Sequence, residues 1–234
     1  MSQSDSSFRV ERVAAPLRHS VTESIRTAIA TGRFKAGDHL PERELCELTG
    51  VSRTLVREAM RQLESEGVVT VEPHRGPFVA RITSEQANGI YQLRSELESF
   101  ACSLFIENAT EDQRKALVTA LAGIRSAARR NADPQARLAA KNNFYDCLVR
   151  GTNNEALGSC LYMLNARITL LRATSLKAPG RIKDSVAELT ALVEALLARD
   201  QPRAEELARD HVAKAAAAAI PLITEESGKK AAKP

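Results

Sequence analysis

Three arginines in one short segment, Arg53, Arg57 and Arg61, recur every four residues. Residues four apart share a face of an α-helix, so the three guanidinium groups are expected to project together. An apolar stripe lies on another side of the same predicted helix, at Val56, Ala59, Met60 and Leu63. Arginine binds phosphate oxygens and presents a planar fork to guanine, so such a helix suits the major groove of DNA. A solvated surface helix often carries a similar row, and the neighbouring segments must decide between the two interpretations.

The flanking segments favour DNA binding. Residues 41–49 predict a short helix that Gly50 ends, and Ser52 is a natural N-cap for the arginine helix. After Gly67, apolar runs at residues 68–71 and 78–81 enclose a Pro-His-Arg-Gly-Pro turn, which predicts a β-hairpin with a basic tip. This order of elements within roughly forty residues predicts a winged helix-turn-helix. A preceding helix over residues 16–32 is expected to brace it, with its apolar stripe at Leu17, Val21, Ile25 and Ile29.

Overall charge does not by itself indicate a nucleic-acid partner. The net charge is +4, and residues 1–82 hold 12 Lys and Arg against 11 Asp and Glu. There is no apolar run long enough to span a membrane and no signal-peptide pattern, and residues 1–15 are expected to be disordered. The cysteines form no C-x-x-C pair, so we expect reduced thiols in a cytoplasmic protein: Cys46, Cys102, Cys147 and Cys160.

The rest of the chain reads as helices separated by caps, glycines and prolines. Thr83 and Thr110 each precede a glutamine by three residues, the spacing of a capping box. Asp133 before Pro134 is typical of another helix start. Six helices are predicted, near 84–108, 111–131, 134–150, 154–176, 181–199 and 202–224. Their short connections predict an antiparallel bundle. The expected organisation is therefore mainly α, with a winged helix-turn-helix over 16–82, an all-helical domain over 83–224 and a flexible tail over 225–234.

The segment GDHLPERELCELTGVSRTLVREAMRQLESEGVV resembles the DNA-binding domain of the GntR family of bacterial transcription regulators. The likeness extends from about Pro16 to Ile82, and Leu55 departs from it where relatives often have proline. It implies a regulator, expected to be a repressor, that binds a palindromic operator in double-stranded DNA as a homodimer. Carried over by position, the DNA-binding residues are Arg43, Arg53, Thr54, Arg57, His74, Arg75 and Gly76. Arg61 is expected to meet phosphate or solvent.

The helical half is similar to the FCD domain of one GntR branch. Arg94, Leu97 and Glu98 fit its Arg-x-x-Leu-Glu motif, and the spacing from Glu188 to His211 fits its last two helices. Many FCD domains hold a divalent metal, but here the four ligand positions are Lys141, Tyr145, Leu189 and His211. Charged lysine and leucine offer no donor to a metal, so we expect no metal and no cofactor. We expect instead a small anionic effector, held by Arg94, Lys141, Tyr145 and His211.

Three alternatives remain at this point. A slipped helix register would turn Asn142, Asn143 or Asp146 inward and restore a metal site. The helical domain could serve only to dimerise, with the pocket filled by its own side chains. An enzyme is the third, because lysine, tyrosine and histidine are capable acid–base groups. The sequence has no nucleophile motif, no glycine-rich phosphate loop and no metal set, so we expect no enzyme.

Overall fold

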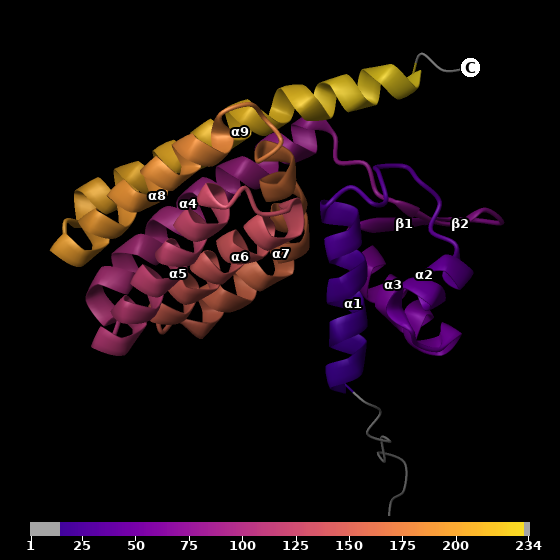
Figure 1. The fold of residues 1–234 in the computed structure, drawn as a ribbon, viewed down its shortest axis with the longest axis horizontal. Helices are drawn as coiled ribbons and strands as arrows, with labels where there is room; N and C mark the ends of the chain where they lie inside the picture. Colours follow the sequence, from indigo (N-terminus) through magenta and orange to yellow (C-terminus); the bar gives the residue numbers. More distant parts are fainter. Residues whose placement is uncertain (1–14, 232–234) are drawn as a thin grey trace, which may run out of the picture.

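The protein consists of an N-terminal head, with three helices and a two-stranded sheet, and a C-terminal helical bundle (Figure 1). The computed structural model describes residues 15–231, with side chains for residues 17–225. The head contains α1 (Ala15–Ala30), α2 (Glu42–Thr49), α3 (Arg53–Ser65), β1 (Val69–Glu72) and β2 (Gly76–Val79). The bundle contains α4 (Ser84–Asn108), α5 (Glu111–Arg129), α6 (Pro134–Gly151), α7 (Glu155–Ser175), α8 (Arg181–Ala198) and α9 (Gln201–Ala231). The predicted fold class is confirmed.

The head is held together by an apolar core beneath the recognition helix α3. All four residues of the predicted α3 stripe lie in it, each 5% exposed or less. Residues from the other head elements complete the core: Val21, Ile25, Ile29, Phe34, Leu40, Leu45, Val68, Val69 and Val79. Burying one such aliphatic side chain contributes roughly 1.5–3 kcal/mol. The core therefore fixes which side of α3 remains free for a partner.

The wing differs in register from the predicted hairpin. β1 begins one residue later than expected and β2 two residues earlier, with Val69 paired to Val79 and Glu72 paired to Gly76. The tip is the three-residue turn 73–75, closed by a hydrogen bond from Arg75 N to Glu72 O of 3.1 Å. His74 itself adopts the left-handed conformation, with φ of 63°. Gly76, expected at the tip, is therefore the first residue of β2.

The predicted capping residues mark where the helices of the bundle begin. Thr83 Oγ1 accepts a hydrogen bond from Gln86 N, and the Gln86 side chain accepts one from Thr83 N. The same reciprocal pair forms between Thr110 and Gln113, and Asp133 caps α6 ahead of Pro134. In Figure 1, α9 runs beside α4 along the bundle. The position at which each helix begins determines which of its residues face the interior of the bundle.

Helix α7 joins the bundle to the head. Ala166 belongs to the apolar core of the head, and Leu170 packs against that core. Arg167 Nε donates a hydrogen bond of 3.0 Å to Glu66 O at the end of α3. Gly67 has φ of +69°, and a Cβ there would lie 2.3 Å from the Arg167 guanidinium. The turn between α3 and β1 thus packs closely against α7, and a movement of α7 would displace the end of α3.

Ser52 at the N-cap and the four free thiols are as predicted, but other local details differ. Leu17 is 46% exposed, because the buried stripe of α1 begins at Val21. Ser52 occupies the N-cap position of α3 without a side-chain hydrogen bond. Cys160, placed among apolar helical positions by the sequence, is exposed, and all four cysteines are free thiols.

The first and last helices extend beyond their predicted bounds. Helix α9 continues past its expected end at 224 to Ala231, so the predicted tail is helical from 225 to 231. Ala15 already belongs to α1. The other residues predicted to be disordered or flexible, 1–14 and 232–234, lie outside the described residues.

Candidate functional site: nucleic-acid interface and buried cationic cluster

The exposed side of α3 presents the predicted DNA-binding residues. Arg53, Thr54 and Arg57 are all exposed there. Arg57 Nε donates a hydrogen bond of 2.6 Å to Glu42 on α2, and this bond lowers the pKa of the Glu42 carboxyl. Arg43, whose side chain is 85% exposed, bonds Glu47 on its own helix at 2.9 Å. Exposed pairs of this kind are weak, so these arginines can exchange a carboxylate for DNA.

The wing places a second group of basic side chains beside α3. His74 is exposed at the tip. The Arg75 guanidinium lies over the Phe78 ring, 5.1 Å from its centroid, and also pairs with Glu72. His39, which sequence reasoning did not select, packs its ring 5.1 Å from Phe78 and bridges to that residue in the sheet. The two rings support the basic tip, and Gly76 lies against His39 behind it.

The four predicted effector residues converge inside the bundle. Arg94 on α4, Lys141 and Tyr145 on α6 and His211 on α9 are each 5% exposed or less. An Arg94 Nη donates to the Tyr145 hydroxyl at 3.4 Å. Burial and the nearby Lys141 lower the pKa of His211 to about 4. We call this group, with the residues described next, the buried cationic cluster.

Sequence reasoning missed two arginines of that cluster. Arg172 on α7 and Arg181 on α8 are both buried. Arg172 lies 3.8 Å from the centroid of the Tyr145 ring, bonds Asn142 Oδ1 at 3.0 Å and lies 3.7 Å from Glu98. Nothing in the sequence marked them, since an arginine within an amphipathic helix is usually solvated.

Two carboxylates partly neutralise the cluster. Glu98 accepts from Arg94 Nε at 2.5 Å. Glu188 accepts two hydrogen bonds from Arg181, at 3.0 and 2.8 Å, and contacts His211 Nδ1 at 2.5 Å. Burial opposes ionisation of Glu188, but the hydrogen bonds from His211 and Arg181 outweigh it and lower its pKa to about 2. The carboxylates are therefore ionised at neutral pH.

Positive charge nevertheless exceeds negative charge in the cluster. Arginines 94, 172 and 181 face the buried carboxylates of Glu98 and Glu188, and Arg172 also interacts with the exposed carboxylate of Asp146. Burial and the nearby Arg94 lower the pKa of Arg172 to about 10. Burial and the arginines also hold the pKa of Lys141 well below its ordinary value. Uncompensated buried charge is costly, so this arrangement favours a ligand that brings negative charge.

Unused hydrogen-bond groups point to the same conclusion. Among the described residues, buried atoms without a partner include Arg94 Nη1, Arg172 Nε, Arg181 Nε, His211 Nε2 and the hydroxyls of Ser99, Ser175 and Ser185. A cavity of about 250 Å³, lined in part by Glu98, Tyr145 and Arg172, adjoins the cluster. A cavity of about 20 Å³ reaches Lys141 and Ser185 from another side. The cluster thus has both unfilled bonding capacity and adjoining space.

The residues of the cluster do not fit a divalent metal. Leu189, at one of the family's ligand positions, is fully buried and has no donor atom, and Lys141 adds a cation. Of the residues in the alternative helix register, Asn143 and Asp146 are exposed, and Asn142 is partly buried but already accepts a hydrogen bond from Arg172. Within the described part of the chain, no three His, Cys, Asp or Glu residues group closely enough to hold a metal ion.

Comparison with known proteins identifies the two parts. The sequence model of "Bacterial regulatory proteins, gntR family" matches residues 17–79, and that of the "FCD domain" matches residues 89–214. The regulator YdhC of Bacillus subtilis is 27% identical over 188 residues, 80% of this chain and 82% of its own. GgaR of Escherichia coli K12 is 48% identical over 65 residues, 26% of each chain. The structure of E. coli McbR/YncC has a TM-score of 0.77 at 22% identity, over 92% of this chain and all of that one.

The chain belongs to the GntR family and carries an FCD domain. It is a transcriptional regulator with a DNA-binding head, and its relatives are regulators, not enzymes. No helix within residues 15–231 is both long and apolar enough to cross a membrane.

Proposed function

We propose that the protein is a homodimeric, cytoplasmic repressor that binds a palindromic operator and responds to a small organic anion in the buried cationic cluster. The excess of buried positive charge over carboxylate carries this proposal. A carboxylate or phosphate ligand would satisfy the unpaired guanidinium and imidazole nitrogens and neutralise the excess.

The head supplies sequence recognition. Arg53, Thr54 and Arg57 lie along the exposed side of α3 and would read base edges in the major groove. Arg43, His74 and Arg75 would position the head on the flanking backbone or groove, with the main chain near Gly76 close to the DNA. Arg57 must leave Glu42 to do so, which costs little because that pair is exposed to solvent.

An apolar stripe on α4 supports a homodimer. Leu93 and Phe100 are 47% and 51% exposed, and the partly buried Leu97 and Leu104 continue the stripe between and beyond them. A second copy that packs its α4 against this stripe would remove it from water and place two heads side by side. Size-exclusion chromatography with light scattering should find a dimer, and Phe100→Glu should yield monomers.

Helix α7 would carry the signal from the effector to the DNA. Arg172 lies in the buried cationic cluster, and Arg167 on the same helix bonds the end of α3. A ligand that draws Arg172 away from Asn142 or Glu98 would shift α7, and with it the head. Binding of effector and operator would then be coupled, each changing the affinity of the other equally.

A thermal-shift screen of EDTA-treated protein tests the effector. The panel contains sugar acids, dicarboxylates, amino acids and acyl compounds, each with and without zinc or nickel. We expect one organic anion to raise the unfolding temperature by several degrees without metal, and Lys141→Ala to abolish the rise.

Other results would redirect the proposal. A rise with metal alone would refute the metal-free site. No response to any compound would favour a bundle that serves only to dimerise.

A further inference from the structure

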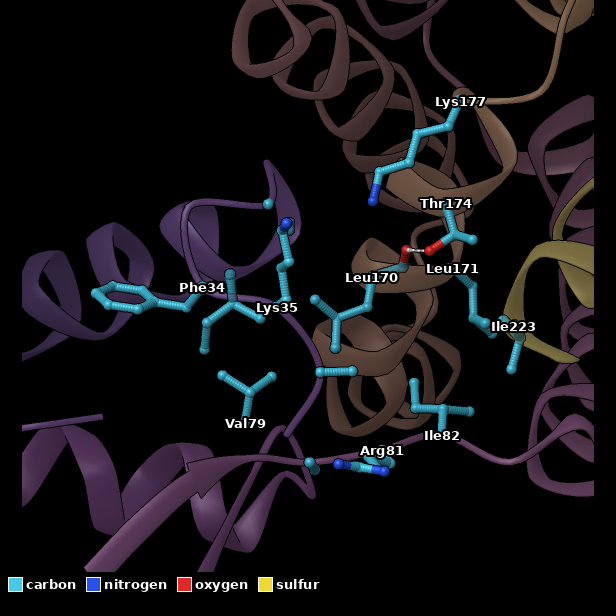
Figure 2. Close-up of a pocket in the computed structure, with 15 residues that line it drawn as sticks. Phe34, Lys35, Val79, Arg81, Ile82, Leu170, Leu171, Thr174, Lys177 and Ile223 are labelled. Atoms are coloured by element: carbon cyan, nitrogen blue, oxygen red, sulfur yellow. Dashed lines mark hydrogen bonds between the residues drawn. The ribbon is translucent and has the colours of Figure 1, made fainter. Parts of the chain in front are cut away.

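A further cavity lies at the joint between the head and the bundle (Figure 2). Helix α7 contributes to its wall, but no residue of the buried cationic cluster lines it. Its volume is about 360 Å³, within the range of roughly 300–1,000 Å³ that is usual for small-molecule sites. The head contributes Ile29 and Val79, and the bundle contributes Leu170, Leu171 and Ile223. The walls are therefore mainly apolar and come from both parts of the molecule.

Cationic side chains border this joint cavity without carboxylates. Lys35 approaches from the head and Lys177 from the connection after α7, on opposite walls in Figure 2. Both residues are exposed, and none of the salt bridges among the described residues uses either ammonium group. Arg81, in the linker, lies over Gly37, where a Cβ would meet its guanidinium at 2.5 Å. No aspartate or glutamate lines the cavity.

The cavity offers few other polar groups to a ligand. The Thr174 hydroxyl is already bonded to Leu170 O at 3.0 Å, as Figure 2 shows. An occupant would therefore place an apolar body against the aliphatic walls and a negative group between the two lysines. That description fits a monocarboxylate with a short hydrocarbon chain.

We propose that the joint cavity is a second ligand site, which takes an amphipathic monocarboxylate and fixes the head relative to the bundle. An occupant touches both Val79 of the wing and Leu170 of α7, so it binds only the arrangement in which these walls face each other. It would shift the protein towards that arrangement by its differential affinity. This inference does not require an anion in the buried cationic cluster.

Isothermal titration of the full-length protein with octanoate tests the site. We expect one octanoate per chain, and at least tenfold weaker binding to the Lys35→Met/Lys177→Met variant. A Lys115→Met/Lys214→Met variant, which removes two exposed lysines elsewhere, should bind as the wild type does. Octan-1-ol, which has the chain without the charge, should bind at least tenfold more weakly than octanoate.

Further variants separate the two proposed sites. Lys141→Met should leave octanoate binding unchanged, whereas Thr174→Phe, which places a ring in the joint cavity, should abolish it. Absence of binding, equal binding by the Lys35→Met/Lys177→Met variant, or equal binding of octan-1-ol would overturn the proposal. Loss of binding in Lys141→Met would overturn it too, because octanoate would then occupy the buried cationic cluster.

A functional readout uses DNA selected from a random library by the wild-type protein. Saturating octanoate should change the affinity for that DNA at least threefold in the wild type and leave it unchanged in the Lys35→Met/Lys177→Met variant. An identical change in both proteins would overturn the proposed coupling.

Discussion

The arginines on the exposed side of the recognition region and those inside the bundle serve opposite purposes in this molecule. In the head, the side chains of Arg43 and Arg57 are 85% and 59% exposed and pair with carboxylates at the surface. In the bundle, those of Arg94 and Arg172 are 0% and 6% exposed, and their partners are buried with them. A surface arginine readily exchanges its carboxylate partner for another anion, because water screens the charges before and after the exchange. A buried arginine is held in place by its packing, so an anionic ligand that pairs with it must enter the bundle.

The largest expected difference between the halves concerns the carboxylate partners. Glu98→Gln should lower the free energy of unfolding by roughly 3–5 kcal/mol, because Arg94 and Arg172 lose their shared buried carboxylate. Glu42→Gln, which removes the partner of Arg57, should leave stability nearly unchanged. Urea denaturation of both variants measures the contrast. Equal effects would mean that the pair of Arg94 and Glu98 is as well solvated as the surface pair.

The pH dependence of stability should also originate in the bundle. The folded protein holds the pKa of His211 at about 4, against an ordinary value of 6.5. Between these values the unfolded chain binds a proton that folded His211 does not, so stability falls as the pH is lowered from about 6.5 to 4. The loss attributable to His211 is up to about 3 kcal/mol. Denaturation midpoints from pH 7 to 4.5 should fall less steeply in His211→Gln, and parallel curves would contradict this assignment.

In the head, the loss of an exposed arginine should affect DNA binding and leave folding stability unchanged. Arg57→Ala should weaken binding to the selected operator by about tenfold to a hundredfold and relax specificity at one base position. Arg61→Ala should weaken all sequences alike or have no effect, and neither change should alter the unfolding midpoint. Gel-shift titrations with operator variants provide the measurement. Wild-type binding by Arg57→Ala would show that Arg57 does not contact the operator.

The smallest expected effect is an increase in stability on removal of an ionisable side chain. Lys141→Met should stabilise the ligand-free protein by about 1–2 kcal/mol, because it removes a buried amine that burial and neighbouring arginines penalise. The same variant should lose any stabilisation by the anionic effector. Thermal unfolding with and without the anion identified in the screen measures both changes. A less stable ligand-free variant would show that Lys141 is well solvated or paired.

Local patterns were enough to predict much of the fold. The apolar stripe of α3 and the capping boxes at Thr83 and Thr110 involve residues within a few positions of each other, so their physics is local. The wing register was less predictable, because the turn places His74 as well as Gly76 in a left-handed conformation that favours glycine. The Pro-His-Arg-Gly-Pro pattern alone does not show that the second strand begins at Gly76.

The sequence by itself determined the class of protein, the recognition helix and the residues that line up along it. Tertiary structure alone decided which arginines are buried. Arg172 and Arg181 look like solvated residues until five helices close around them, and only then do their charges, together with that of Arg94, outnumber those of Glu98 and Glu188. The joint cavity is likewise invisible in the sequence, since Lys35 and Lys177 lie far apart in the chain and line one cavity only when the head docks against α7. Burial and charge balance are properties of the packed chain, and no local pattern encodes them.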